Sequence, residues 1–156
     1  MRLTIAAVGR AGSGPESDLF ETYRARAEAA GRGIALAPIT LHEVDERKAR
    51  SRAQQSERLL ERTHGDAVVI ALDERGRTCT SPDFAKSLAD WRDQGRAEAL
   101  FLIGGADGHE KSVRQRANVL LGFGQMVWPH MLVRVMLAEQ IYRAVSILTN
   151  GPYHRA

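Results

Sequence analysis

The side chains best suited to chemistry stand together at the C-terminus, as Tyr153, His154 and Arg155. A histidine exchanges a proton near neutral pH, an arginine stabilises negative charge, and a tyrosine stacks on or orients a flat ring. Gly151-Pro152 precedes them and is expected to end a helix and to turn the three side chains outward. The tripeptide is therefore the first candidate for a catalytic or substrate-positioning group. The alternative is that it only binds a phosphate group of the substrate.

The segment that carries this tail reads as an almost wholly apolar helix from His130 to Asn150. Such a helix has little polar surface to expose to solvent, which indicates that it is buried on several sides. The simplest partner for its remaining apolar surface is a second copy of the chain. Glu139 and Arg143 stand four residues apart, the spacing of an ion pair along a helix. Arg134 has two interpretations, either an RNA contact or a cap on a neighbouring backbone carbonyl.

Three loops that contain glycines follow apolar runs and are the candidate binding loops, at residues 9–14, 103–108 and 121–129. The first has the spacing G-x-x-G-x-G and lacks a P-loop lysine, so it predicts a structural loop rather than a phosphate cradle. In the second, Gly104-Gly105 would let a flat ligand approach the backbone, although a tight turn needs the same residues.

The third loop, residues 121–129, mixes glycines with large apolar side chains ahead of the last helix. Backbone hydrogen bonds and apolar contacts of this kind can hold an adenine, as small-molecule sites often do. The alternative is that Met126, Val127 and Trp128 simply fill the core.

The elements that must position these loops alternate along the chain. The expected strands are Leu3–Val8, Ile34–Ile39, Ala67–Leu72, Ala99–Ile103 and a short one within residues 118–123. The expected helices are Pro15–Ala30, Asp45–Thr63, one capped by Ser81 that runs to Asp93, His109–Arg116 and His130–Asn150. Unbroken apolar runs are typical of parallel strands buried on both faces. This order predicts a single doubly wound α/β domain with its ligand site beyond the carboxyl ends of the strands.

Composition sets the outer limits on function. The chain is 44% hydrophobic and 26% charged, as expected for one globular domain, and its net charge of +3 suits a polyanionic partner. No signal peptide or membrane span is expected, which predicts a cytoplasmic protein. Cys79 is the only cysteine, so an intrachain disulfide and a cysteine-based zinc site are excluded. The histidines at 42, 64 and 109 share no metal-ligand spacing and are expected to be exposed.

Several motifs taken together resemble the ribosomal large-subunit methyltransferase H family, which belongs to the SPOUT class. The resemblance covers the whole chain and is most specific in its C-terminal part. The residues that carry it are Leu72-Asp73, Phe101-Leu102-Ile103-Gly104-Gly105, Trp128-Pro129-His130, Leu132-Val133-Arg134-Val135, Leu137-Ala138-Glu139-Gln140, Tyr142-Arg143-Ala144 and Asn150-Gly151-Pro152-Tyr153-His154-Arg155.

The resemblance implies a SPOUT (alpha/beta knot) fold with a mostly parallel sheet and a C-terminal trefoil knot. It also implies a homodimer, S-adenosylmethionine (SAM) bound in the knot, and no metal. Its substrate would be a pseudouridine in the 23S rRNA stem-loop at the subunit interface of the ribosome, methylated at N3. The SAM contacts carried over by position are Leu72, Gly104, Gly105, Gly124, Gln125, Met126, Val127, Trp128 and Pro129.

In that reaction the tail residues would have separate tasks. His154 would accept the N3 proton, Arg155 would stabilise the developing anion, and Tyr153 would stack on or orient the base. Arg134 and Arg143 would contact the RNA. Two alternatives remain open at this point: a noncatalytic ribosome-binding factor with the same fold, and a nucleotide-binding or flavin-binding α/β protein that uses the loop at residues 9–14.

Overall fold

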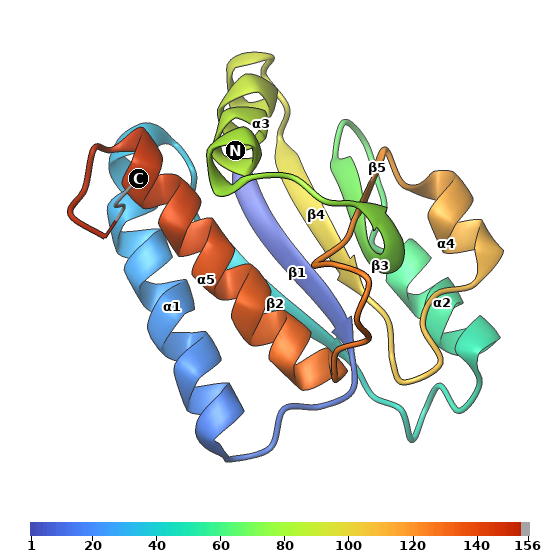
Figure 1. Ribbon diagram of the computed structural model, residues 1–156. Helices are drawn as coiled ribbons and strands as arrows, with labels where there is room; N and C mark the ends of the chain where they lie inside the picture. The colour runs from blue at the N-terminus through green and yellow to red at the C-terminus, as the bar shows by residue number, and fades with distance from the viewer. Residues whose placement is uncertain (154–156) are drawn as a thin grey trace.

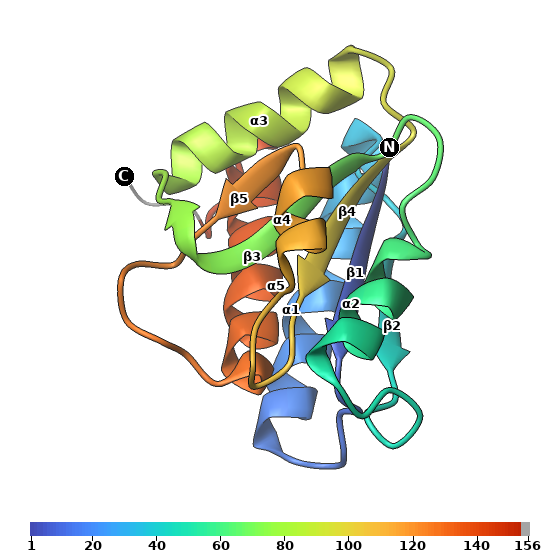
Figure 2. The same ribbon diagram turned by 90° about the vertical axis from the view of Figure 1, so that its right-hand side faces the viewer.

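In the computed structural model, which describes residues 1–153, five parallel strands form one sheet between two layers of helices (Figures 1 and 2). The strand order is β2-β1-β4-β3-β5, and all neighbouring pairs are parallel. The strands are β1 Arg2–Val8, β2 Ile39–Val44, β3 Val68–Arg77, β4 Glu98–Ile103 and β5 Val119–Leu121. The helices are α1 Pro15–Gly31, α2 Arg52–Leu60, α3 Ser81–Asp93, α4 Lys111–Arg116, α5 His130–Leu148 and a 3-10 turn, η1, at Arg32–Ile34.

Each face of the sheet builds its own core, because successive side chains of a strand point to opposite sides. Helices α1, α3 and α5 cover one face, where Ile5, Ile70 and Phe101 are buried against them. The shorter helices α2 and α4 cover the other face, over Ala71 and Leu102 (Figure 2). Burial on both faces explains why the central strands are unbroken apolar runs, and the predicted parallel α/β architecture is confirmed.

The second strand begins later than the sequence suggested. We expected a strand at Ile34–Ile39, but β2 starts at Ile39, after η1 and a cis Ala37-Pro38 peptide. Proline has no N–H to give to a strand ladder, so the pairing starts beyond Pro38.

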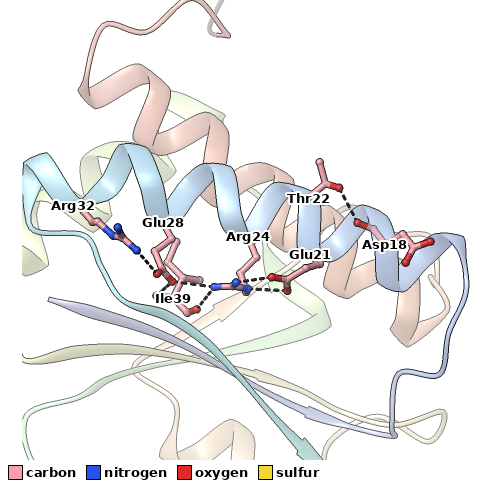
Figure 3. Close-up of polar contacts among 7 residues, drawn as sticks. All are labelled: Asp18, Glu21, Thr22, Arg24, Glu28, Arg32 and Ile39. Atoms are coloured by element: carbon pink, nitrogen blue, oxygen red, sulfur yellow. Dashed lines mark hydrogen bonds and ion pairs between the residues drawn. The ribbon is translucent and has the colours of Figure 1, made fainter.

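Polar contacts with α1 hold the start of β2 at the edge of the sheet (Figure 3). Arg24 Nη1 donates to the carbonyl oxygen of Ile39 at 2.9 Å, and the Ile39 N–H donates to Glu28 Oε2 at 3.1 Å. The Ile39 N–H and the Arg32 guanidinium together lower the pKa of Glu28. The edge strand is therefore attached to α1 by both polar groups of its first residue.

Two helix starts also differ from expectation. The helix expected over Asp45–Thr63 is shorter, because Ser51 caps it: Ser51 Oγ accepts from the Gln54 N–H at 3.2 Å, and Gln54 Oε1 accepts from the Ser51 N–H at 3.3 Å. In α3 the cap is Thr80 rather than Ser81, since Thr80 Oγ1 accepts from the Asp83 N–H at 3.2 Å. Both caps satisfy N–H groups that a helix leaves unpaired in its first turn.

The last helix, α5, lies alongside α1 and α3 and ends close to its predicted limit (Figure 1). Asn150 adopts the left-handed conformation at φ 56°, and the Gly151 N–H donates to the Ser146 carbonyl at 2.8 Å. This arrangement closes the helix as a left-handed C-terminal cap does. Within residues 1–153, no helix is both long and apolar enough to cross a bilayer. The trefoil knot stays a prediction.

Candidate functional site

A cavity of about 770 Å³ opens at the carboxyl ends of β3, β4 and β5 and extends to the first turn of α5. Small-molecule sites have volumes of a few hundred to about 1,000 Å³, and doubly wound sheets bind ligands at this edge. The cavity is lined by Ile103 and Leu121, the last residues of β4 and β5, and by Leu72, the last β3 residue that pairs with β4. The predicted position of the ligand site is therefore occupied by a real cavity.

The loop after β4 contributes two residues without side chains, Gly104 and Gly105, to the cavity lining. A Cβ atom on Gly104 would lie 2.9 Å from the carbonyl carbon of Gly108, and one on Gly105 would lie 3.0 Å from Val8 Cγ1. The Gly108 N–H also donates to the Gly105 carbonyl at 3.0 Å. The interpretation as a tight turn is confirmed. The loop also lines the cavity, and the approach of a flat ligand to its backbone stays a prediction.

His109 lies behind this loop, and its predicted exposure is wrong. Its side chain is buried, with Nε2 3.2 Å from the Leu102 carbonyl oxygen. Burial lowers the pKa of His109, because the charged imidazolium is disfavoured away from water. Arg114 Nη1 donates to the His109 carbonyl at 2.6 Å and lies 3.6 Å from Asp73 Oδ2. These contacts hold α4 to the ends of β3 and β4.

The loop between β5 and α5 forms an apolar wall that is open to solvent. Met126 is 72% exposed, Val127 76% and Trp128 39%, so the alternative that these residues fill the core is wrong. The cavity is lined by eight of the nine residues carried over from the family resemblance: Leu72, Gly104, Gly105, Gly124, Met126, Val127, Trp128 and Pro129. Gln125 is exposed and lies outside the lining.

The sequence did not identify every group in this cavity. The polar additions include Asp73, Glu74, Arg75 and His130, and the apolar additions include Phe123 and Val133. Leu72-Asp73 at a strand end was the available signal for the acids, whereas the others reach the cavity only through the fold. Within residues 1–153, no three histidine, cysteine or acidic side chains are grouped as metal ligands.

Two glycines let β3 and the chain after β5 touch beside the cavity. A Cβ atom on Gly76 would lie 2.4 Å from the carbonyl carbon of Leu121, and one on Gly122 would lie 2.7 Å from the Gly76 carbonyl oxygen. No side chain fits at such distances, so the contact is one of backbone with backbone. The contact positions residues 123–129 over the cavity.

Arg134 is buried, and the structure shows it as a cap on backbone carbonyls. Its Nη2 donates to the carbonyl oxygens of Val8 and Gly9 at 2.7 and 2.5 Å, and its Nη1 lies 2.8 Å from Glu43 Oε1. With 1% of the residue exposed, the guanidinium has no surface to offer RNA, so that interpretation is wrong. The first loop therefore packs under α5 and does not line the cavity, which agrees with its predicted structural role.

Tyr153 turns inward, contrary to the expectation that the tail residues point outward. Its hydroxyl donates to Glu139 Oε1 at 2.9 Å, and its ring centroid lies 4.5 Å from that of Tyr142. The predicted pair within α5 is confirmed, with Arg143 Nη2 2.6 Å from Glu139 Oε1. His154 and Arg155 lie outside the residues that the structure describes.

The cavity and the contacts of Tyr153 occupy different parts of α5. His130 at the start of the helix lines the cavity, whereas Tyr153 packs at the level of Glu139. Nine residues of α-helix separate these levels, or about 13 Å along the axis.

Comparison with known proteins agrees with this geometry. The family described as "Predicted SPOUT methyltransferase" matches residues 1–154. The chain is 52% identical to the ribosomal RNA large subunit methyltransferase H of Dinoroseobacter shibae, over 99% of both chains. It is 54% identical to the protein of that name from Cereibacter sphaeroides and 49% identical to that from Paracoccus denitrificans, with the same coverage. With its parallel sheet and its cavity at the strand ends, the chain belongs to the SPOUT methyltransferases, in the large-subunit methyltransferase H family.

Proposed function

We propose that this protein is a SAM-dependent methyltransferase that methylates N3 of a pseudouridine in the intersubunit stem-loop of 23S rRNA. The observation that carries the proposal is the cavity, because eight of the nine SAM contacts implied by the family lie together on its surface. The relatives' shared name, which specifies large-subunit ribosomal RNA, supports the substrate class. An rRNA substrate also implies action in the cytoplasm, where ribosomes work.

The residues present fit SAM. Gly104 and Gly105 line the cavity in a turn that packs too closely on Gly108 and Val8 for a side chain, and Met126, Val127 and Trp128 offer apolar surface for an adenine ring. The lining carries charges of both signs: Asp73, Glu74 and Asp107 suit the sulfonium and ammonium groups of SAM, and the arginines at 52, 75 and 114 suit its carboxylate. When bound, SAM supplies a methyl group that is already activated.

The side chains of the protein have two tasks in this reaction. They position the base, and they accept the proton that leaves N3. Bound SAM would supply the methyl group for N3 of the pseudouridine, and the proton on N3 would need an acceptor. His154 accepts the N3 proton, and Arg155 stabilises the negative charge that develops on the ring oxygens. Holding the two reactants in line contributes several kcal/mol to the rate. Arg143, whose side chain is 30% exposed, remains the candidate RNA contact on α5.

A homodimer forms part of the proposal. Apolar side chains stay exposed near the starts of α1 and α5, including Leu19, Val127 and Leu132, and a groove of about 660 Å³ lies between α1, α3 and α5. A second copy would cover this surface. The tail of one protomer could then reach the cavity of its partner, since the cavity and Tyr153 of the same chain lie at different levels of α5. Sedimentation equilibrium should give about twice the 17.2 kDa of one chain, whereas a single-chain mass at micromolar concentration would overturn this part.

The function is tested by transfer of a labelled methyl group from SAM to ribosomes that lack the modification. Ribosomes with and without the pseudouridine are assayed in parallel, and the label is mapped within 23S rRNA. We expect incorporation at one pseudouridine and none in ribosomes that carry uridine there. No incorporation by protein that binds both SAM and ribosomes would refute the proposal and favour the noncatalytic factor.

Replacing Gly105 with valine is expected to abolish detectable SAM binding. The new Cβ would lie 2.9 Å from Gln55 Oε1 and 3.0 Å from Val8 Cγ1, so either these side chains or the turn that lines the cavity must shift. We expect the Kd to rise by about 100-fold or more, which corresponds to roughly 3 kcal/mol. Isothermal titration calorimetry measures the affinity, and circular dichroism checks that the protein is folded.

Gly12→Val is the matched control, because a Cβ on Gly12 has no atom within 4 Å. This variant should bind SAM as the wild type does, whereas a nucleotide-binding or flavin-binding protein that uses residues 9–14 would be damaged by it. Wild-type affinity in Gly105→Val would contradict the placement of SAM in this cavity.

A further inference from the structure

Tyr153 is the centre of a cluster that we call the tyrosine clamp, formed with Tyr23 of α1 and with Glu139, Tyr142 and Arg143 of α5. The Tyr153 ring centroid lies 4.5 Å from Tyr142 and 6.5 Å from Tyr23, the latter edge-on at 62°. The Arg143 guanidinium carbon lies 5.0 Å from the same centroid, within the range of a cation–π contact. Three side chains thus pack on this ring, and a nucleobase would have to displace them in order to stack.

The hydroxyl of Tyr153 is also occupied. Glu139 Oε1 accepts from it at 2.9 Å and from Arg143 Nε and Nη2 at 3.0 and 2.6 Å, while Glu139 Oε2 accepts from Gln140 Nε2 at 2.7 Å. The ionised pair of Glu139 and Arg143 therefore holds the phenol as a donor. Burial raises the pKa of Tyr153, as does the neighbouring carboxylate, so the phenol stays protonated and does not act as a base.

The clamp also fixes the direction in which the chain leaves α5. Asn150 reverses the backbone at φ 56°, and Tyr153 is attached to a residue fourteen positions earlier in the chain. The next residue along is His154, one of the two groups that the proposed function assigns to proton and charge handling. An attachment one residue before such a group limits where that group can reach.

We infer that Tyr153 is a positioning residue: its hydrogen bond to Glu139 attaches the last described residue of the tail to α5, and the proposed methyl transfer depends on this attachment. This replaces the stacking role expected for Tyr153, and it rests on the proposed function in that the two following residues act in methyl transfer. Both partners of this attachment belong to the chain itself. The Tyr153 phenol donates to the Glu139 carboxylate, which Arg143 holds in place.

A double-mutant cycle between Tyr153→Phe and Glu139→Gln tests the inference. Each change weakens the same hydrogen bond, so each should lower kcat by on the order of tenfold, and the double variant should be no slower than the worse single variant. The Kd for SAM should stay at the wild-type value, because none of these residues lines the cavity. Tyr142→Phe is the matched control, since its ring packs in the clamp while Glu139 accepts the hydroxyl of Tyr153.

A stacking role predicts the opposite result. Tyr153→Phe would then keep wild-type turnover because phenylalanine stacks equally well, and Glu139→Gln would act only through its ion pair with Arg143. Wild-type turnover in Tyr153→Phe overturns the inference, as does a double variant whose loss is the product of the two single losses.

A second measurement decides the attachment without any enzymatic assay. The chain contains three tyrosines, so fluorotyrosine labelling gives three fluorine resonances that single tyrosine-to-phenylalanine variants assign. We expect the Tyr153 resonance to lie away from the position of free fluorotyrosine and to move toward it in Glu139→Gln. An unchanged Tyr153 resonance in Glu139→Gln overturns the clamp. If the wild type transfers no methyl group, the proposed function fails, while this shift still reports whether Tyr153 is attached.

Discussion

Deletion of Tyr153–Ala156 is expected to abolish methyl transfer and to leave the SAM affinity within about twofold of the wild type. The cavity is lined by residues from β3, β4 and β5, from the loops after β4 and β5, from α2 and α4, and from the first turn of α5, and none of these residues lies beyond Val133. The groups proposed to accept the proton and to stabilise the anion, in contrast, are all removed. Single-turnover transfer to ribosomes and calorimetric titration with SAM measure the two quantities separately.

Removal of Ala156 alone is the matched control, because it shortens the chain and retains His154 and Arg155. It should behave as the wild type. A noncatalytic ribosome-binding factor would show a different pattern, in which the four-residue deletion weakens ribosome binding and there is no turnover to lose. Loss of SAM binding in the deletion variant would contradict the division of roles between the cavity and the tail.

Arg134→Met is expected to lower the free energy of unfolding by about 3 kcal/mol, through a buried contact that lies outside the cavity lining. The substitution keeps an apolar chain of similar length but leaves the carbonyls of Val8 and Gly9 without their donor. Glu43 loses the guanidinium as well, but it keeps the hydrogen bond from the Ala11 N–H, and its side chain is 25% exposed to water, which limits the cost. Urea unfolding followed by circular dichroism measures the change, and the melting temperature should fall by roughly 6–12 °C.

Arg58→Met is the control for the loss of a charge alone. Arg58 of α2 pairs with Glu61, the residue that follows the helix, and both side chains are more than half exposed, so its removal should leave the unfolding curve close to the wild type. Equal stability of Arg134→Met and the wild type would show that the buried guanidinium contributes nothing to the packing of the first loop against α5.

The sequence predicted the sheet well, because its signal is simple. Strands buried on both faces, such as β3 and β4, must be apolar without interruption, and this pattern has few other causes. The start of β2 was missed because Ile34 and Leu36 look like strand residues, whereas the attachment of Ile39 to α1 depends on Arg24 and Glu28 from a different element.

The sequence predicted the parts of the site that are formed by the backbone. It missed the parts whose position depends on the packing of side chains. Glycines at strand ends mark positions where the main chain must be accessible, which is why Gly104 and Gly105 were found. Met126 looks the same in sequence whether it fills a core or faces solvent, and its exposure follows from the path of the loop. The inward turn of Tyr153 depends on Glu139, a residue that the sequence analysis paired only with Arg143.

The contact between Gly76 and Gly122 also restricts how β5 can pair. A slip of β5 by one residue along β3 would place Leu121 or Phe123 where Gly122 now meets the Gly76 carbonyl, and a side chain at that point has no space. The three-residue strand is too short to fix its own register by hydrogen bonds alone. The two glycines therefore fix the register of β5 on β3. This register sets how many residues remain to connect the sheet to α5.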